Sequence, residues 1–476
     1  MAFQDGGSIG YGSDDSLQDL ADRSSPILKQ SKIFDNRGIH LEKIQFYGFD
    51  MDYTLCEYIS PEFDILAFNL AKEFLVSSFS YPQEILKLEY NPEFPCRGLW
   101  FDKEHGNLLK VDQFGRILMC CHGFRLLEGE ELRKLYPHKI QRKEEKRIYI
   151  MNTLFNIAET HLLASIVHYM DNREDAMVTT EGWLLGSEKK LKTFKQMFED
   201  VRGSIDYLHD EKLLKQKTVE NLEKYIKKDE RLIGVLTRIR ESGRKTFLLT
   251  NSDWWYTNHI MTFLLQNNSN EKESWLDYFD LTIVDACKPT FFNKGTNFKM
   301  VDTCTGEKVD LNSKPVHERP VVYSGGDHHT VSNLLGADGP DVMYCGDHLH
   351  ADVVKCRKLS EWRTLLIVPE LEYEMSVGLE QGELMNQLQN LERICGQVEP
   401  EDQDGFRRRI KDGVKKMDRS FAKTGSIFRA GTRLSYFGSN VLAWADLYTG
   451  SVCNLYSYSL QHRFIGTQIL LPHELQ

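Results

Sequence analysis

The chain has 476 residues, of which 41% are hydrophobic and 27% are charged, a composition that is ordinary for a soluble globular protein. Its net charge of −11 argues against a mainly nucleic-acid-binding surface, which is normally basic. No run of about 18 apolar residues is present, so no membrane partner is expected.

The amino-terminal part of the chain is typical of an intracellular protein. Residues 1–35 are rich in Gly, Ser and Asp, which predicts a disordered segment. This segment lacks the basic-then-apolar pattern of a secretory signal. The ten cysteines of the chain are scattered without a CxxC pair, as expected for reduced thiols. We therefore expect a cytoplasmic location.

The stretch from Ile44 to Tyr58 reads IQFYGFDMDYTLCEY and begins as a buried strand, because large hydrophobic side chains occupy both faces. Asp50 and Asp52 follow at the end of this strand. Two carboxylates at such a place are costly unless a cation or a reacting group meets them. Ligands of open α/β sheets bind at this edge. The alternative is an Asx turn that simply ends the strand, so the DxDxT motif alone is only suggestive.

Further along, the pattern predicts an α/β protein with an insertion. Helical periodicity covers 61–78, 153–170 and 187–210, and a β-meander is expected within 97–123. The buried-strand pattern returns at 245–252, 280–286, 342–347 and 363–369, with helical stretches between, which predicts a parallel sheet. The predicted parts are a core at 36–58 and 231–398, an insertion at 59–230, and a segment at 399–476 that packs on the core or at an oligomer interface.

Polar side chains follow the later strands as well. They are Thr250, Asn251, Ser252, Lys288, Asp347 and Asp352. Hydroxyl and amide groups bind phosphate oxygens, a lysine neutralises them, and a pair of aspartates supplies hard oxygen ligands for Mg²⁺. Taken singly, the first three residues also read as a helix N-cap, and the lysine also reads as a surface residue.

Together and in this order, these clusters resemble the four motifs of the haloacid dehalogenase superfamily of phosphotransferases. Other segments resemble the purine 5′-nucleotidases of that superfamily: YPQE (81–84), RGLWFD (97–102), GNLLKVD (106–112), NTLFN (152–156), KTVENLEKY (217–225), TNSDWWYT (250–257), VDACKPTFF (284–292), VVYSGG (321–326) and GDHLHAD (346–352). The resemblance implies a haloacid-dehalogenase-like Rossmannoid core, with a large α+β cap inserted between the first two motifs. It covers nearly the whole chain.

The resemblance also implies a reaction and its residues. Asp50 matches the nucleophile that forms an aspartyl-phosphate, and Asp52 matches the acid/base. Asp50, Asp347 and the backbone carbonyl of Asp52 match the Mg²⁺ ligands, with Asp352 as their support. Thr250, Asn251, Ser252 and Lys288 fall on phosphate-binding positions. The implied activity is hydrolysis of IMP, GMP and their deoxy forms, with transfer of phosphate to a nucleoside as a second outcome.

Residues of the insertion match the positions that bind the base and the sugar. Phe155 matches the aromatic side chain that stacks on the base, and Arg202, Asp206, His209 and Lys215 match the polar group. A helix would place Arg202, Asp206 and His209 on one face. Without the resemblance they would read as an exposed ion pair and a surface histidine. Asp210 departs from the family, which has a tyrosine there, and this puts the base preference in doubt.

Regulation and assembly are also implied only by the resemblance. Asn152 and His350 match positions of a site for an activating, ATP-like nucleotide, but His350 replaces a phenylalanine of the family, so that site is altered. The family forms tetramers, which predicts a homo-oligomer. Two other functions stay open: a nucleotide-binding regulatory protein with weak turnover, and a phosphatase for another small phosphate ester.

Overall fold

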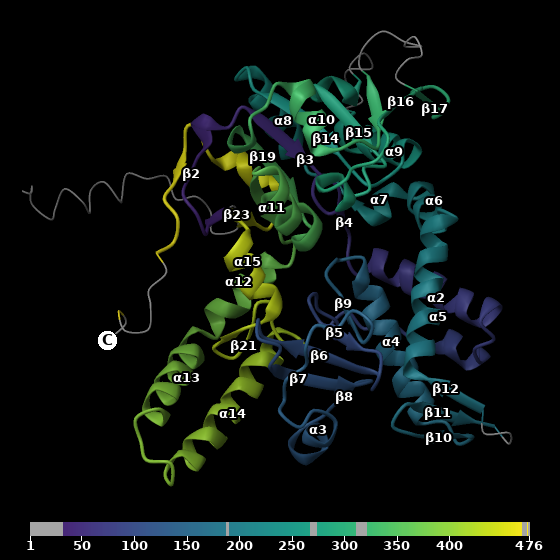
Figure 1. The fold of residues 1–476 in the computed structure, drawn as a ribbon, viewed down its shortest axis with the longest axis vertical. Helices are drawn as coiled ribbons and strands as arrows, with labels where there is room; N and C mark the ends of the chain where they lie inside the picture. Colours follow the sequence, from purple (N-terminus) through teal and green to yellow (C-terminus); the bar gives the residue numbers. More distant parts are fainter. Residues whose placement is uncertain (1–31, 187–189, 267–273, 311–320, 469–473, 475–476) are drawn as a thin grey trace, which may run out of the picture.

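This computed structural model describes residues 32–186, 190–266, 274–310, 321–468 and 474 (Figure 1). Of the segment predicted to be disordered, residues 1–31 lie outside this description. The ordered chain begins earlier than the predicted residue 36, because Ile33 is buried and β1 (Phe34–Asp35) pairs with a strand near the carboxyl terminus. Ile33 and Phe34 form an apolar pair at the end of the polar segment, and the predicted boundary lies two residues beyond Phe34.

A ten-stranded sheet occupies the upper part of the molecule in Figure 1. Its order is β1, β23 (Leu447–Thr449), β20 (Arg363–Ile367), β19 (Val342–Gly346), β3 (Phe46–Phe49), β14 (Lys245–Leu249), β15 (Leu281–Val284), β18 (Val322–Ser324), β16 (Lys299–Val301) and β17 (Lys308–Asp310). The strands from β23 to β18 are parallel, and the two edges are antiparallel. The predicted α/β class and each of the buried strands are confirmed.

Gly48 lets two central strands of this sheet pack closely. A Cβ atom at this position would lie 2.1 Å from the Phe247 ring of the neighbouring β14. The Phe247 ring therefore fills the space beside Gly48 and packs closely against β3, the strand that leads to Asp50 and Asp52.

The carboxyl-terminal segment does more than pack on the core. It supplies β23, which lies in parallel beside β20 and is flanked on its other side by β1. A strand of three residues gives no readable alternation, which is why the sequence did not reveal it. Before it, α14 (Gln403–Phe421) begins inside the expected linker at 399–405 and packs on α13 (Gly382–Cys395), at the lower left of Figure 1. The helices α12 (Leu371–Glu380) and α15 (Tyr436–Trp444) connect this pair to the sheet.

Between β3 and β14 the chain leaves the sheet and forms a second α+β unit, at the lower right of Figure 1. Its helices are α2 (Glu62–Ser78), α3 (Gly129–Leu135), α4 (Asn156–Asp171), α5 (Phe194–Asp210), α6 (Leu213–Glu220) and α7 (Leu222–Tyr225). One of its sheets has five strands in the order β8 (Arg125–Leu126), β7 (Ile117–His122), β6 (Asn107–Val111), β5 (Trp100–Asp102) and β9 (Ile148–Ile150). A second sheet has three strands, β10 (Ala176–Val178), β11 (Gly182–Leu185) and β12 (Lys190–Thr193). The predicted meander is confirmed by β5, β6 and β7.

The helix predicted over 187–210 starts later than expected. Residues 187–189 lie outside the description, and Leu191 belongs to β12. Thr193 begins the helix, because its hydroxyl accepts the backbone N–H of Gln196 at 3.1 Å while the Gln196 side chain accepts the backbone N–H of Thr193.

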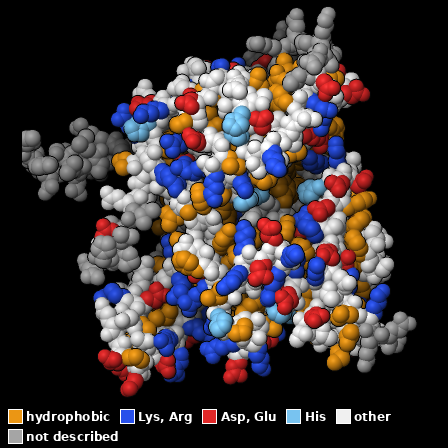
Figure 2. All heavy atoms as spheres, viewed as in Figure 1, with side chains coloured by type: hydrophobic (Ala, Val, Ile, Leu, Met, Phe, Trp, Pro, Cys, Tyr) orange, Lys and Arg blue, Asp and Glu red, His pale blue; other side chains and the backbone are white. Residues whose placement is uncertain are grey.

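The chain enters and leaves the second unit side by side. β4 (Glu57–Tyr58) and β13 (Ile226–Lys227) form an antiparallel pair between the unit and the sheet. After β13, α8 (Arg231–Glu241) leads to β14, and α9 (Trp254–Leu265) follows that strand. Among the described residues, no helix combines the length and the apolar character needed to cross a membrane. Acidic and basic side chains are interspersed over the face shown in Figure 2, which carries no continuous basic surface.

Candidate active site

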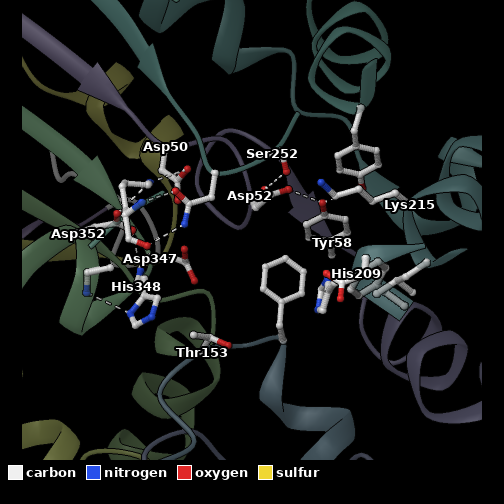
Figure 3. Close-up of a pocket in the computed structure, with 18 residues that line it drawn as sticks. Asp50, Asp52, Tyr58, Thr153, His209, Lys215, Ser252, Asp347, His348 and Asp352 are labelled. Carbon is white, nitrogen blue, oxygen red and sulfur yellow. Dashed lines mark hydrogen bonds and ion pairs between the residues drawn. The ribbon is translucent and has the colours of Figure 1, made fainter. Parts of the chain in front are cut away.

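A cavity of about 400 Å³ lies between the carboxyl ends of the parallel strands and the second α+β unit (Figure 3). Its lining residues are Asp50, Asp52, Tyr58, Phe63, Thr153, Phe155, His209, Asp210, Leu214, Lys215, Asn251, Ser252, Tyr256, Lys288, Asp347, His348, Ala351 and Asp352. The side chains at the ends of β3, β14 and β19 meet here, as the parallel order requires.

Three buried carboxylates converge at one end of this cavity. Asp50, Asp347 and Asp352 each offer an oxygen, and these oxygens all lie within 4.8 Å of one another. Gly346 permits this approach, because a Cβ atom there would lie 2.5 Å from the Cβ of Asp352. The first position of the pattern GDxxxxD is therefore glycine because a side chain there would collide with Asp352.

Lys288 ties two of these carboxylates together. Its Nζ lies 2.9 Å from Asp50 Oδ1 and 2.9 Å from Asp352 Oδ1, and it donates to the Tyr344 hydroxyl at 2.8 Å. The Asn251 amide fixes the Lys288 peptide from both sides. It accepts the Lys288 N–H at 2.7 Å and donates to its carbonyl at 3.0 Å. Lys288 is therefore buried and held in place within the site, so the alternative of a surface residue is wrong.

The charges at this end do not balance within the protein. Burial raises the pKa of Asp50 to about 8 although Lys288 lowers it, and burial together with Asp50 and Asp352 raises the pKa of Asp347. Arg97 lies 4.0 Å from Asp347 but is engaged by Glu370 at 2.6 Å. When all three carboxylates are ionised, the single ammonium of Lys288 leaves two negative charges, which a divalent cation would neutralise.

Asp52 lies beside this group and is held at both oxygens. Tyr58 donates its hydroxyl proton to Oδ1 at 2.6 Å, and Ser252 donates to Oδ2 at 2.8 Å. Thr250 lies behind Ser252, fully buried and outside the cavity lining, where its hydroxyl accepts the Ser252 N–H at 3.0 Å. Of the predicted phosphate-binding residues, Asn251, Ser252 and Lys288 reach the cavity, whereas Thr250 supports them.

The opposite end of the cavity is more open. Figure 3 shows His209 and Lys215 across the cavity from Asp50, Asp347 and Asp352. Phe155 also lines the cavity, with its ring centroid 6.1 Å from that of His209 and edge-on to it. Lys215 Nζ lies 3.4 Å from Asp253 Oδ2.

Comparisons with known proteins agree with this geometry. A sequence profile described as the 5′ nucleotidase family matches residues 33–476. The chain belongs to this family. A relative in Dictyostelium discoideum, named 5′-nucleotidase domain-containing protein, is 32% identical over 470 residues, which are 95% of this chain and 76% of the relative. The resemblance found in the sequence is confirmed at the level of the family, and the chain is a hydrolase of nucleotide monophosphates.

In this nucleotidase, Arg202 and Asp206 do not line the cavity, although the sequence groups them with His209. Arg202 pairs with the buried Glu159 of α4 at 2.7 Å and with Asp206 at 2.7 Å. Asp210, the departure from the family pattern, does line the cavity. The base end therefore combines three predicted side chains, Phe155, His209 and Lys215, with Asp210, whose effect on the base preference the sequence left open.

The expected effector residues flank the cavity without lining it. Asn152 directly precedes the lining residue Thr153, and His350 lies between His348 and Ala351, which also line it. Burial and the nearby charges of Lys143, Lys355 and Lys358 lower the pKa of His350, so its ring is neutral at physiological pH.

Sequence reasoning missed several residues of the nucleotidase site. Tyr58 and Tyr256 line the cavity, and their hydroxyl oxygens lie 2.8 Å apart. Arg97 donates to the Asp347 carbonyl at 3.2 Å. His348 accepts the backbone N–H groups of His350 and Ala351 through Nδ1. All four lie within segments quoted in the sequence analysis, and a polar side chain inside such a segment was the available signal.

Proposed function

We propose that this chain is a Mg²⁺-dependent 5′-nucleotidase that hydrolyses 6-oxopurine nucleoside monophosphates through an aspartyl-phosphate. The core would be of the haloacid dehalogenase type, with residues 59–230 as its cap. One observation carries the proposal: Asp50 and Asp52 meet Lys288, Asp347 and Asp352 at the buried end of the cavity, with the excess of negative charge described above.

The metal site would consist of Asp50, Asp347 and the backbone carbonyl of Asp52, with Asp352 as support. Asp352 suits that supporting role because it holds Lys288 and accepts the His348 N–H at 3.1 Å. When bound, Mg²⁺ supplies positive charge that offsets the charge of the transferring phosphoryl group.

In the first half-reaction, a carboxylate oxygen of Asp50 attacks phosphorus and the bond to the nucleoside 5′ oxygen breaks. Asp52 gives its proton to that oxygen, and the nucleoside leaves as a neutral alcohol. Lys288 offers positive charge and Asn251 an amide N–H to the phosphoryl oxygens, which gain charge in the transition state, while the Ser252 hydroxyl stays on Asp52.

In the second half-reaction, water attacks the phosphorus of the aspartyl-phosphate and Asp52 takes a proton from it. Asp50 is restored as a carboxylate and inorganic phosphate leaves. If a nucleoside hydroxyl occupies the place of water, the same step transfers phosphate to it, which is the basis of the proposed phosphotransferase activity.

The base would stack on Phe155, with His209 and Lys215 near its edge and the sugar. Desolvation of the ring by surrounding protein atoms, together with the positive charges of Arg202 and Lys215, lowers the pKa of His209, although part of its side chain stays exposed. The neutral ring can both donate and accept a hydrogen bond. Asp206 lies outside the cavity lining, three positions before the lining residue His209 on the same helix. Because its side chain is 59% exposed and Arg202 binds only its Oδ1, we infer that Asp206 Oδ2 accepts N1–H of a 6-oxopurine at the rim of the cavity, a group that adenine lacks. The remaining parts of the proposal are an ATP-like effector near Asn152 and His350, a homo-oligomer and a cytoplasmic location.

The test is phosphate release from IMP, GMP, AMP, CMP and UMP, with and without Mg²⁺. We expect turnover only with Mg²⁺ and highest kcat/KM with IMP and GMP. Because Arg202 is already paired within the protein, a phosphatase for another small phosphate ester is the second candidate. It would release phosphate from p-nitrophenyl phosphate but not from any of the five nucleotides. Binding of nucleotide without any turnover would instead indicate a regulatory protein.

A further inference from the structure

A line of buried hydroxyl groups runs from Asp52 into the second α+β unit. The Tyr58 hydroxyl donates to Asp52 Oδ1 at 2.6 Å and lies 2.8 Å from the Tyr256 hydroxyl (Figure 3). The Thr218 hydroxyl of α6, which donates to the Leu214 carbonyl at 2.8 Å, lies beside Tyr256. Exposure falls along this line, from 6% at Tyr58 to 2% at Tyr256 and 0% at Thr218.

This line joins three parts of the fold. Tyr58 belongs to β4, where the chain enters the second unit, and Tyr256 belongs to α9, which follows the catalytic strand β14. Thr218 lies on α6, the helix that also carries Lys215 of the cavity. The orientation of the Asp52 side chain therefore depends on contacts made by both units.

Asp52 needs a fixed orientation in two protonation states. It must present a proton to the leaving oxygen in one half-reaction and accept one from water in the next. A carboxyl group held at one oxygen only, by Ser252, can still turn about its axis. The second bond, from Tyr58, removes that freedom.

A tyrosine pair can keep this bond in both states because each hydroxyl can donate or accept. Next to the carboxylate, Tyr58 donates to Asp52 and accepts from Tyr256. Next to the protonated acid, whose proton faces the leaving oxygen, Tyr58 still donates to a lone pair of Oδ1 and accepts from Tyr256. No proton leaves either tyrosine, so the reaction balance is unchanged.

We propose that Tyr58 and Tyr256 are positioning residues that keep the Asp52 carboxyl group aimed at the leaving oxygen. The inference rests on the proposed function only in taking Asp52 as the acid of the first half-reaction. It does not depend on which base or which ester is the substrate.

The variant Tyr58→Phe removes the hydroxyl and keeps the ring, whose centroid lies 4.2 Å from that of Phe63. The full-length chain with Mg²⁺ is assayed on phenyl phosphate and p-nitrophenyl phosphate, which have nearly the same shape. Phenolate is a poor leaving group that needs a proton, whereas p-nitrophenolate leaves without one. We expect kcat/KM to fall about 10-fold or more for phenyl phosphate and less than about 3-fold for p-nitrophenyl phosphate.

Two further variants test how the pair works. Tyr256→Phe should give a smaller loss of the same leaving-group dependence, and the double variant should match Tyr58→Phe, because Tyr256 acts through Tyr58. Tyr81→Phe is the matched control. It removes another buried tyrosine hydroxyl that donates to a carboxylate, Asp200 Oδ2 at 2.9 Å, away from the cavity lining. This control variant should leave kcat/KM unchanged for both aryl phosphates.

An equal loss on both aryl phosphates, or no loss on either, would overturn the positioning role. Assays with IMP separate this result from the proposed function. A wild-type chain that cleaves both aryl phosphates but no nucleotide overturns the nucleotidase substrate while the leaving-group comparison still decides the role of Tyr58. A wild-type chain that cleaves none of these esters overturns both.

Discussion

The two ends of the cavity are built differently. At the carboxylate end, Asp50, Lys288 and Asp352 are at most 8% exposed and lie within 2.9 Å of a charged partner. At the base end, His209 and Asp210 are exposed, and Phe155 meets His209 only edge-on. The first end is a closed network of paired charges, and the second is an open wall of separate side chains.

This difference indicates that the carboxylate end sets the rate of phosphate release from every substrate, whereas the base end sets the preference among substrates. A buried network holds its dipoles and charges in place before the substrate arrives, so its members act on every substrate in the same way. Open side chains contribute only to the ligand groups that they touch, so they change the ranking of substrates. Substitutions at the two ends should therefore have different kinetic signatures.

The largest effect is expected from Asp50→Asn, which keeps the shape of the side chain and removes the nucleophile. Turnover of every nucleotide should fall by more than about 10³-fold, because no aspartyl-phosphate can form. Phosphate release and acid-quench detection of the phosphoenzyme measure this. Turnover close to that of wild type on any substrate would show that the carboxylate end does not work as described.

Next in size is Lys288→Met, which removes the ammonium that holds Asp50 and Asp352. We expect loss of turnover on all substrates alike and a destabilisation of about 3–5 kcal/mol in urea unfolding, because two buried carboxylates lose their partner. The control is Lys227→Met, which breaks the exposed 3.0 Å pair with Glu57 and should cost less than about 1 kcal/mol. Equal costs would mean that burial does not distinguish the two lysines.

A smaller and more selective effect is expected at the base end. Asp206→Ala should reduce the preference for IMP over AMP by about 1–3 kcal/mol in kcat/KM and leave p-nitrophenyl phosphate unchanged. Glu199→Ala is the control, because it breaks an exposed i,i+4 pair with Lys195 on the same helix. If wild type uses IMP and AMP equally, the interpretation of this wall is wrong, and Asp210 becomes the first residue to change.

The smallest effect is expected at the flanking site. A neutral imidazole offers less stacking area than a phenyl ring, so ATP should activate wild type weakly and His350→Phe more strongly. An ATP titration of both proteins with IMP as substrate measures this. No gain of ATP response in the phenylalanine variant would remove the effector site from the proposal and leave the hydrolase assignment intact.

The parts that the sequence predicted are those set by repeated local pattern. Asp50, Ser252, Lys288 and Asp347 each follow an apolar strand, and parallel strands bring such ends together. What it did not predict depends on partners distant in sequence. Arg202 forms an ion pair with Glu159 of another helix, and Tyr256 contacts Tyr58, which lies 198 positions earlier in the chain. Local periodicity cannot predict either contact, because it compares only residues close in sequence.

The place of β23 in the large sheet has a consequence for biosynthesis. Every residue proposed for catalysis has been synthesised once the chain reaches Asp352. The outer edge of β20 is covered only when Leu447–Thr449 has also been made, and β1 pairs with the same strand. Until then the nascent protein presents a bare row of strand N–H and C=O groups, which is a template for pairing with a neighbouring chain. A product that ends before Leu447 would keep the proposed catalytic set and aggregate all the same.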